Sequence, residues 1–308
     1  MTDPFLSSSD ITTPYVGRFA PSPTGPLHLG SLIAAIASFL EAKKNQGQWL
    51  LRMEDLDPPR EETGAAQQIL DCLQTHGLNW DGKVLWQSQR HDTYQQTVSK
   101  LLSEGNAYYC CCSRTDIQQM GGIYDGRCRN NNKVSSKDSA VRITINSDIT
   151  GFDDQLQGHF SQDLITEIGD FVIKRKDGLF AYQLAVVLDD HSQGVTHILR
   201  GSDLLDSTPR QIYLQQLLAL STPNYTHIPV ITHSDGQKLS KQTHACALDP
   251  KQAALNLRQA LHFLNQPPPP TSAVTVHEVL DAALEYWQLK RIPAAQAIDQ
   301  AVLDNFND

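Results

Sequence analysis

Short apolar runs separated by polar loops make up the first third of the chain. Tyr15–Ala20 and Trp49–Met53 have the length and composition of buried strands, and Leu32–Leu40 between them predicts a buried helix. Residues 61–76 and 89–104 carry apolar positions at helical spacing, which predicts two amphipathic helices. Because helices and strands alternate, we expect an α/β fold with a doubly wound parallel sheet of the Rossmann type.

Three residues mark expected ends of helices. Gly47 follows the first helix and has the residue type that is typical of the C′ position. Ser88 is a candidate N-cap for the helix that starts at residue 89, and Pro209 occupies the first turn of a helix expected from about Thr208 to Leu220. These signals define where the predicted helices begin and end.

The pattern changes after the first third of the chain. Residues 105–140 hold most of the cysteines and a long polar segment. Three later runs, Val141–Ile145, Asp170–Lys174 and Phe180–Leu188, have the composition of strands. Val195–Arg200 then resembles the buried strands of the first third, so we expect the middle region to be an insertion within an α/β domain.

The chain is expected to divide into four parts. The first half of a catalytic domain (1–104) precedes the insertion (105–187), and the second half (188–245) precedes a helical C-terminal segment (246–308). The four consecutive prolines Pro267–Pro270 must interrupt that last segment as a non-helical linker. The sequence contains no internal repeat.

Length, composition and charge restrict the class of protein. The 308 residues can bury a full core in two or three domains, and no apolar run approaches the roughly 18 residues of a membrane span. The first ten residues lack the basic and apolar regions of a signal peptide, so we expect a cytoplasmic protein. We also expect the protein to be a monomer. The net charge of −9 disfavours non-specific binding of nucleic acid, although a local basic patch can still bind RNA.

The stretch Gly17–Ser31 predicts a site for an anion. A strand ends in a loop with three prolines and leads directly into a helix, whose first backbone N–H groups and dipole favour a negative ligand. His28 and Ser31 can donate hydrogen bonds to phosphate, and Gly30 lets a ligand approach the backbone. The alternative is an ordinary turn in which His28 caps the helix.

A second candidate for phosphate chemistry lies far downstream. Lys238 and Lys241 are three residues apart in the polar loop Lys238–Gln242, with Ser240 between them. Two lysines in a loop can neutralise a polyphosphate. A lone pair of lysines at this spacing usually marks a solvated surface, so its interpretation depends on the anion loop upstream.

Together the two segments resemble the signature pair of class I aminoacyl-tRNA synthetases. Ser31 and Gln242 stand where the family pattern has His and Ser, while both lysines and Ser240 are kept. Segments similar to the glutamyl branch lie in the expected order over residues 15–245: Arg18–Gly25, Leu51–Asp57, Tyr182–Asp190 and Arg200–Asp203. This resemblance implies a catalytic domain that uses ATP, Mg²⁺ and L-glutamate.

The resemblance also implies roles for single residues. The ATP-binding set is His28, Gly30, Ser31, Lys238, Ser240 and Lys241, with His28, Lys238 and Lys241 as the catalytic members. The glutamate-binding set is Arg18, Phe19, Ala20, Pro21, Ser22, Glu54, Tyr182 and Arg200. Guanidinium forks suit the two carboxylates of glutamate, and an acid suits its ammonium group. Each arginine could instead form a structural salt bridge.

Four of the six cysteines lie between Cys110 and Cys128. In a reducing compartment such a cluster is more typical of a metal site than of a disulfide framework. The spacing Cys110-x-Cys112, Tyr124-x₃-Cys128 resembles the zinc-binding insertion of one group in the family, which implies one structural Zn²⁺ with these four ligands. Cys111 is an alternative ligand, and buried reduced thiols are the alternative without a metal.

The acceptor of the activated glutamate depends on the rest of the chain. Only 66 residues follow Gln242, fewer than a separate anticodon-binding domain needs. With the cysteine cluster, this resembles the group that activates glutamate without tRNA and joins it to queuosine in the anticodon of tRNA(Asp). The alternatives are a minimal synthetase that charges the 3′ end of tRNA(Glu), a small-molecule nucleotidylyltransferase, and a zinc-dependent RNA-binding module.

Overall fold

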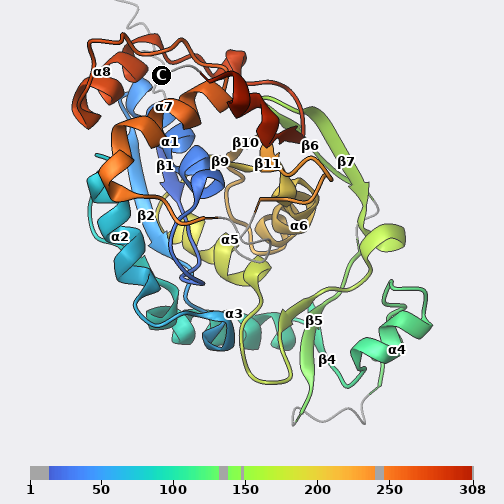
Figure 1. The fold of residues 1–308 in the computed structure, drawn as a ribbon. Coiled ribbons are helices and arrows are strands. Elements are labelled where there is room, and N and C mark those ends of the chain that lie inside the picture. The colour runs from blue at the N-terminus through green and yellow to red at the C-terminus, as the bar shows by residue number, and fades with distance from the viewer. Residues whose placement is uncertain (1–13, 132–137, 147–148, 240–245, 307–308) are drawn as a thin grey trace, which may run out of the picture.

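In the computed structural model, which describes residues 14–131, 138–146, 149–239 and 246–306, parallel strands open the fold (Figure 1). They pair in the order β1 (Val16–Phe19), β2 (Gln48–Met53) and β3 (Leu85–Trp86). α1 (Leu29–Lys44) connects the first two strands and α2 (Ala65–Thr75) the next two. The predicted alternation of strands and helices is confirmed here.

A second parallel pair lies beside the first sheet. β9 (His197–Gly201) pairs with β10 (Asn224–Ile228), and α6 (Thr208–Leu217) connects them. The backbone N–H of Thr196 donates to the carbonyl of Val16 over 2.9 Å, so β9 begins next to β1. α6 starts with proline in its first turn, as its sequence predicted.

The prediction of a strand over Phe180–Leu188 is wrong. These residues belong largely to α5 (Tyr182–Ser192), a helix that packs against α6 and against α3 (His91–Ser103). Four consecutive residues from Leu184 to Val187 are buried, so no polar face interrupts the apolar run. A helix that is buried all round and a buried strand give the same short apolar pattern, which explains the error.

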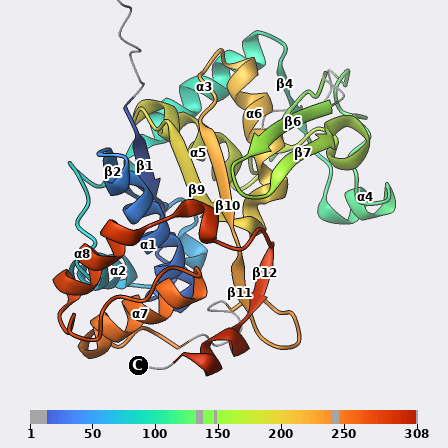
Figure 2. The ribbon, with the colours of Figure 1, turned by 90° about the horizontal axis from the view of Figure 1, so that it is seen from above.

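The insertion contains two small antiparallel sheets. In the first, β5 (Ala140–Ile143) pairs with β4 (Ala107–Cys110) and β8 (Val172–Lys174), and the short α4 (Arg114–Gln119) follows β4. The second is a hairpin of two strands, β6 (Ile149–Asp154) and β7 (Gly158–Asp163). This hairpin packs against α6 and β10 (Figure 2). Its strands carry too few apolar residues for the sequence to predict them.

The C-terminal segment is helical with one exception. α7 (Ala253–Phe263) and α8 (Val276–Tyr286) both pack against α1, and Pro267–Pro270 lies between them outside any helix, as predicted (Figure 1). However, β12 (Ala297–Asp299) pairs in parallel with β11 (Val230–Thr232). The prediction of an entirely helical end is therefore wrong at β12, because three residues are too few to establish a strand pattern.

The two largest apolar clusters of the described residues join the sheets to the helices. The larger joins α1, β2 and α7 through side chains such as Leu32, Trp49 and Leu257. The other joins α3, α5 and the insertion through Tyr94, Leu184 and others. Among the described residues, the longest apolar helices all fall short of what is needed to cross a membrane.

Two predicted helix ends differ in detail. The left-handed C′ residue after α1 is Gln46 (φ 53°), and Gly47 follows it. Gly47 is required for a close approach instead, because a Cβ there would lie 2.3 Å from the carbonyl oxygen of Tyr15. Ser88 does not cap α3: its backbone N–H and hydroxyl both donate to the carboxylate of Asp55.

Candidate active site

Every described residue of the predicted ATP and glutamate sets lines one cleft. The cleft has a volume of about 1130 Å³, larger than the roughly 300–1,000 Å³ of single-ligand pockets, and it opens at the carboxyl ends of β1, β2 and β9. Its walls include Arg18, Phe19, Ala20, Pro21, Ser22, His28, Gly30, Ser31, Glu54, Tyr182, Arg200 and Lys238. Ser240, Lys241 and Gln242 lie outside the described residues.

The start of α1 forms one wall of the cleft. The Nδ1 atom of His28 accepts a hydrogen bond from the backbone N–H of Ser31 over 3.4 Å, so His28 is the N-cap. A Cβ at Gly30 would lie 3.1 Å from both the His28 ring and the side chain of Ile231. His28 therefore caps the helix, as the alternative interpretation predicted, and it also lines the cleft.

Lys238 is held at the cleft by an acidic residue that the sequence had left without a role. Its Nζ atom lies 2.5 Å from Oδ2 of Asp203. A Cβ at Gly201 would lie 2.5 Å from Oδ1 of the same carboxylate, so glycine makes room for Asp203. Asp203 thus helps to set the position of the Lys238 ammonium group.

A buried network of two arginines and two carboxylates forms the wall near β2. Oδ1 of Asp190 lies 3.1 Å from Nε of Arg18 and 2.7 Å from Nη1 of Arg52. The other terminal nitrogen of Arg52, Nη2, lies 3.2 Å from Oε1 of Glu54. Burial disfavours charge on Asp190, but Arg18 and Arg52 hold the pKa of this carboxyl below its ordinary value. Burial raises the pKa of Glu54 against the opposing effect of both arginines. The four formal charges balance.

Arg200 has a different environment. Its Nε donates to Nε2 of His227 over 3.0 Å. Its Nη2 donates over 2.8 Å to the hydroxyl of Thr208 and to the amide oxygen of Gln211. Its Nη1 lies 3.4 Å from the hydroxyl of Tyr182, another cleft residue. In the part of the chain that the structure describes, no carboxylate lies within ion-pair distance of Arg200. A buried cation with neutral partners suits an anionic ligand in the cleft.

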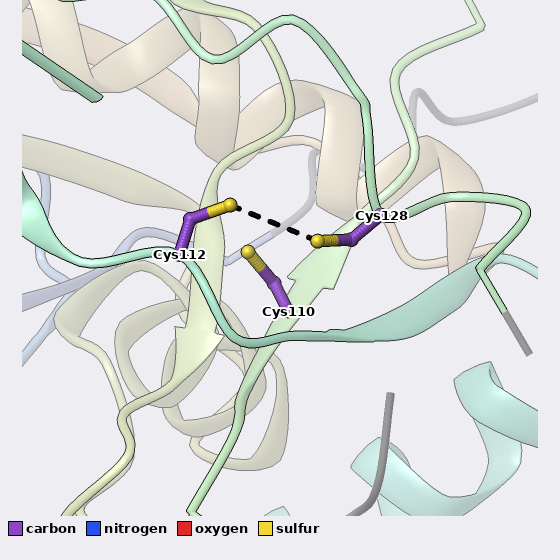
Figure 3. A group of neighbouring side chains, drawn as sticks. All are labelled: Cys110, Cys112 and Cys128. Carbon is purple, nitrogen blue, oxygen red and sulfur yellow. Dashed lines mark hydrogen bonds between the residues drawn. The ribbon is translucent and has the colours of Figure 1, made fainter. Parts of the chain in front are cut away.

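Away from the cleft, three cysteines of the insertion converge (Figure 3). The Sγ atoms of Cys110, Cys112 and Cys128 all lie within 4.8 Å of one another. The hydroxyl of Tyr124 lies 3.5 Å from Sγ of Cys110 and accepts the backbone N–H of Cys128 over 3.0 Å. Cys111 is exposed and is not a member of this group.

The chemistry of this donor set fits a soft metal ion. Three thiol sulfurs and one phenol oxygen supply four ligand atoms, the number that Zn²⁺ takes in structural sites. Burial and the neighbouring cysteines raise the pKa of Cys112 to about 12, so without a cation this thiol stays protonated. The cysteine cluster can therefore hold a metal ion, although an oxygen from tyrosine is an uncommon ligand.

Sequence reasoning missed several charged residues behind the cleft. Arg52 interrupts the apolar run of the buried strand β2, and Asp190 follows the apolar part of α5. Charged residues are rarely buried unless they are paired, so a charge within an apolar run predicts a buried ion pair. His227 in β10 gives the same weak signal. Asp154, in a polar hairpin, gives none.

The chain matches known proteins over almost its whole length. The family model "tRNA synthetases class I (E and Q), catalytic domain" matches residues 15–256. A glutamyl-Q tRNA(Asp) synthetase from Pseudomonas fluorescens is 48% identical over 96% of this chain and 99% of its own. One from Cronobacter sakazakii is 50% identical over 94% of this chain and 97% of its own.

A solved structure supports the fold independently. The glutamate-tRNA synthetase from Elizabethkingia anophelis superimposes with a TM-score of 0.77 at 23% identity, over 94% of this chain and 69% of that chain. At this identity the likeness establishes the class I synthetase catalytic fold and nothing finer. The sequence relatives are close enough to place the chain further: it belongs to the family of the glutamyl-Q tRNA(Asp) synthetases, within the class I E and Q tRNA synthetases.

Proposed function

We propose that the protein activates L-glutamate with ATP and transfers it to the queuosine base in the anticodon of tRNA(Asp). The name of its relatives supports this acceptor. The observation that carries glutamate as the substrate is Arg200, a buried cation in the cleft whose partners among the described residues are neutral. A dicarboxylic amino acid supplies the missing negative charge.

The cleft offers a partner for each charged group of glutamate. Arg200 and the hydroxyl of Tyr182 bind one carboxylate; burial raises the pKa of Tyr182, so its hydroxyl stays protonated and can donate. Arg18 orients the other carboxylate, and Glu54 accepts from the ammonium group. Phe19 to Ser22 supply the backbone that encloses the substrate.

ATP occupies the part of the cleft at the start of α1. Its phosphates lie at His28, Gly30 and Ser31. Lys238 and, from outside the described residues, Lys241 offset charge on the β- and γ-phosphates, and Ser240 donates a hydrogen bond to them. Mg²⁺ bound with ATP would offset further phosphate charge.

In the first step a glutamate carboxylate oxygen attacks the α-phosphorus in line. The new O–P bond forms as the bond to pyrophosphate breaks, giving glutamyl-adenylate. A queuosine hydroxyl then attacks the glutamyl carbonyl, loses its proton and displaces AMP. Lys238 and Lys241 stabilise the charge that develops on the leaving pyrophosphate.

The finer architecture is also a proposal. We infer that β3, β2, β1, β9 and β10 together form one doubly wound Rossmann-type sheet, because the Thr196–Val16 hydrogen bond joins the two parallel groups. The four-part division predicted from the sequence goes with it, although its border at residue 187 falls inside α5.

A two-part measurement tests this function. Glutamate-dependent ATP–pyrophosphate exchange should proceed with no RNA present. Radioactive glutamate should then label tRNA(Asp) that carries queuosine but not tRNA(Asp) that lacks it, and ribonuclease mapping should locate the label in the anticodon fragment. Label at the 3′ end of tRNA(Glu), with exchange only when tRNA is present, would support the minimal charging enzyme instead.

We further propose that Cys110, Cys112, Tyr124 and Cys128 hold one structural Zn²⁺. Metal analysis should find about one zinc per chain in the wild type. Cys112→Ser should lower that content, whereas Cys111→Ser is the matched control and should retain it, because Cys111 lies outside the group. Equal zinc loss in both variants would contradict the ligand set.

A further inference from the structure

Three buried side chains from distant parts of the sequence form a line that ends at Arg200. Oδ2 of Asp154, at the end of β6, lies 2.7 Å from Nδ1 of His227 in β10. Nε2 of the same histidine lies 3.0 Å from Nε of Arg200 in β9. The side chains of Asp154 and His227 are both fully buried. Neither residue lines the cleft, so they act on a ligand only through Arg200.

The donor and acceptor roles along this line are fixed by chemistry. Arginine only donates, so Nε2 of His227 must be an unprotonated acceptor and the ring proton must sit on Nδ1. That proton is donated to Oδ2 of Asp154. The other oxygen, Oδ1, accepts from the backbone N–H groups of Leu156, Gln157 and His227 over 3.0, 2.9 and 3.2 Å. Only a carboxylate accepts on both sides.

The surroundings of His227 are consistent with a neutral ring. Burial lowers its pKa, and the nearby cation Arg200 lowers it further, whereas Asp154 opposes both effects. The ring also stacks near Tyr225, with centroids 6.1 Å apart, and contacts the hydroxyl of Thr208 at 3.2 Å. A neutral His227 leaves the positive charge on Arg200 available to a ligand.

The line also decides which edge of the guanidinium faces the ligand. His227 occupies Nε, and Thr208 and Gln211 occupy Nη2. Nη1 is left beside Tyr182, the one of these hydrogen-bond partners that lines the cleft. Without the acceptor at Nε, only the two bonds to Nη2 would hold the guanidinium in this orientation.

We infer that Asp154 and His227 are positioning residues for glutamate binding: they lock the imidazole tautomer that orients Arg200 toward the substrate carboxylate. The inference rests on the proposed role of Arg200 as a carboxylate ligand. It also assigns a role to the β6–β7 hairpin, which is hydrogen-bonded to β10. The side-chain amide of Gln157 donates to the carbonyl of His227 over 2.8 Å, and the backbone N–H of Gln155 donates to the carbonyl of Tyr225 over 3.0 Å. Through this hairpin the insertion supports the amino-acid site.

Asp154→Asn is the first test. An asparagine whose oxygen still accepts from the Leu156 and Gln157 amides turns its NH₂ group toward Nδ1 of His227. Nδ1 must then accept, so the ring proton moves to Nε2. There it faces the Nε–H of Arg200, and the hydrogen bond between them is lost. The KM for glutamate in ATP–pyrophosphate exchange should rise about tenfold or more, the scale of one disrupted buried hydrogen bond. The KM for ATP should not change, and kcat should stay within about threefold.

Asp170→Asn is the matched control. Asp170 is another buried carboxylate of the insertion, which accepts from Arg129 and from the backbone N–H of Ile145, and it does not line the cleft. It should lose stability in a thermal melt but keep the wild-type KM for glutamate. A wild-type KM for glutamate in Asp154→Asn, or an equal rise in both variants, would overturn the inference.

Two substitutions of His227 separate positioning from simple support of the hairpin. His227→Gln can place an amide oxygen near the former Nε2 and accept from Arg200, so its glutamate KM should stay within about threefold of wild type. His227→Asn can place an amide nitrogen near Nδ1 and keep the bond to Asp154, but it leaves Nε of Arg200 without an acceptor. Its glutamate KM should rise about tenfold.

The order of these two variants decides the outcome. If His227 only fastens the hairpin, His227→Asn is the milder change, and that result would overturn the inference, as would equal impairment of both. The wild-type assay keeps the two proposals apart. Absence of glutamate-dependent exchange in the wild type would refute the proposed function itself, whereas normal wild-type exchange with unaffected variants refutes only the positioning role.

Discussion

Arg18 and Arg200 line the same cleft and are almost equally buried, with 4% and 6% of their surface exposed, yet their charges are handled differently. Arg18 shares the carboxylate of Asp190 with Arg52, so its charge is neutralised within the protein. Arg200 contacts an imidazole, two hydroxyls and an amide, and the carboxylate of Asp154 is linked to it through His227.

The difference separates a network that also stabilises the fold around the site from a cation whose charge is left for the substrate. A neutralised buried network is costly to break, because removing one partner leaves a charge without compensation. A buried cation with neutral partners costs stability while the cleft is empty and is compensated when an anion binds. We therefore expect changes in the Arg18 network to lower stability and changes at Arg200 to lower activity.

The largest expected effect is on stability, in Asp190→Asn. Losing this carboxylate leaves Arg18 and Arg52 without their shared counter-ion, which should lower the free energy of unfolding by about 3–5 kcal/mol in urea titrations. Asp177→Asn is the control. The side chains of Asp177 and its partner Arg175 are 50% and 39% exposed, so both can turn to water and the loss should be clearly smaller. Equal losses of unfolding free energy in the two variants would mean that the Arg18 network contributes no more to stability than an exposed ion pair.

Arg200→Met should give the next largest effect, on activity. The cleft would lose its uncompensated cation, and kcat/KM for glutamate should fall about a hundredfold or more, roughly 3 kcal/mol, in ATP–pyrophosphate exchange. Its free energy of unfolding should fall by less than that of Asp190→Asn.

Arg18→Met is the comparison variant. It should lower both activity and stability, since Asp190 would keep only Arg52 as a partner. If Arg18→Met and Arg200→Met lost the same amount of stability, the contrast between the two arginines would be wrong.

The residues that touch the cleft could be predicted from the sequence, whereas those that support them could not. Arg18 and Arg200 lie near the carboxyl ends of β1 and β9, Glu54 follows β2 and Tyr182 begins α5. All four lie within segments that resemble a known family. The insertion hairpin was missed because its polar strands carry no strong period, and Asp154 was missed with it.

The helix α5 was misread for the opposite reason. Its buried face extends all round, so the run from Phe180 to Leu188 carries no helical period that could distinguish it from a buried strand. The pairing of Asp154 with His227 joins residues 73 positions apart, and only the packing of the hairpin on β10 brings them together. Local sequence patterns contain no information of that kind.

The smallest expected effect is a pH dependence that comes from Glu54. Burial raises its pKa, so protons compete with the ammonium group of glutamate for this carboxylate at a pH above the usual range for glutamic acid. Because protonation removes the charge that binds the ammonium group, the KM for glutamate should rise as the pH falls through this raised pKa, by less than about tenfold over the whole range. Exchange kinetics between about pH 5 and pH 8 would measure it.

Glu54→Gln supplies the control for that dependence. It cannot ionise at this position, so its KM for glutamate should be higher than that of the wild type at neutral pH and should lose the part of the pH dependence that Glu54 causes. Titration of groups outside the amino-acid pocket would affect both proteins alike. A pH profile that is the same in both proteins would mean that Arg52 keeps Glu54 ionised throughout, and that the charge of Arg52 outweighs burial at this carboxylate.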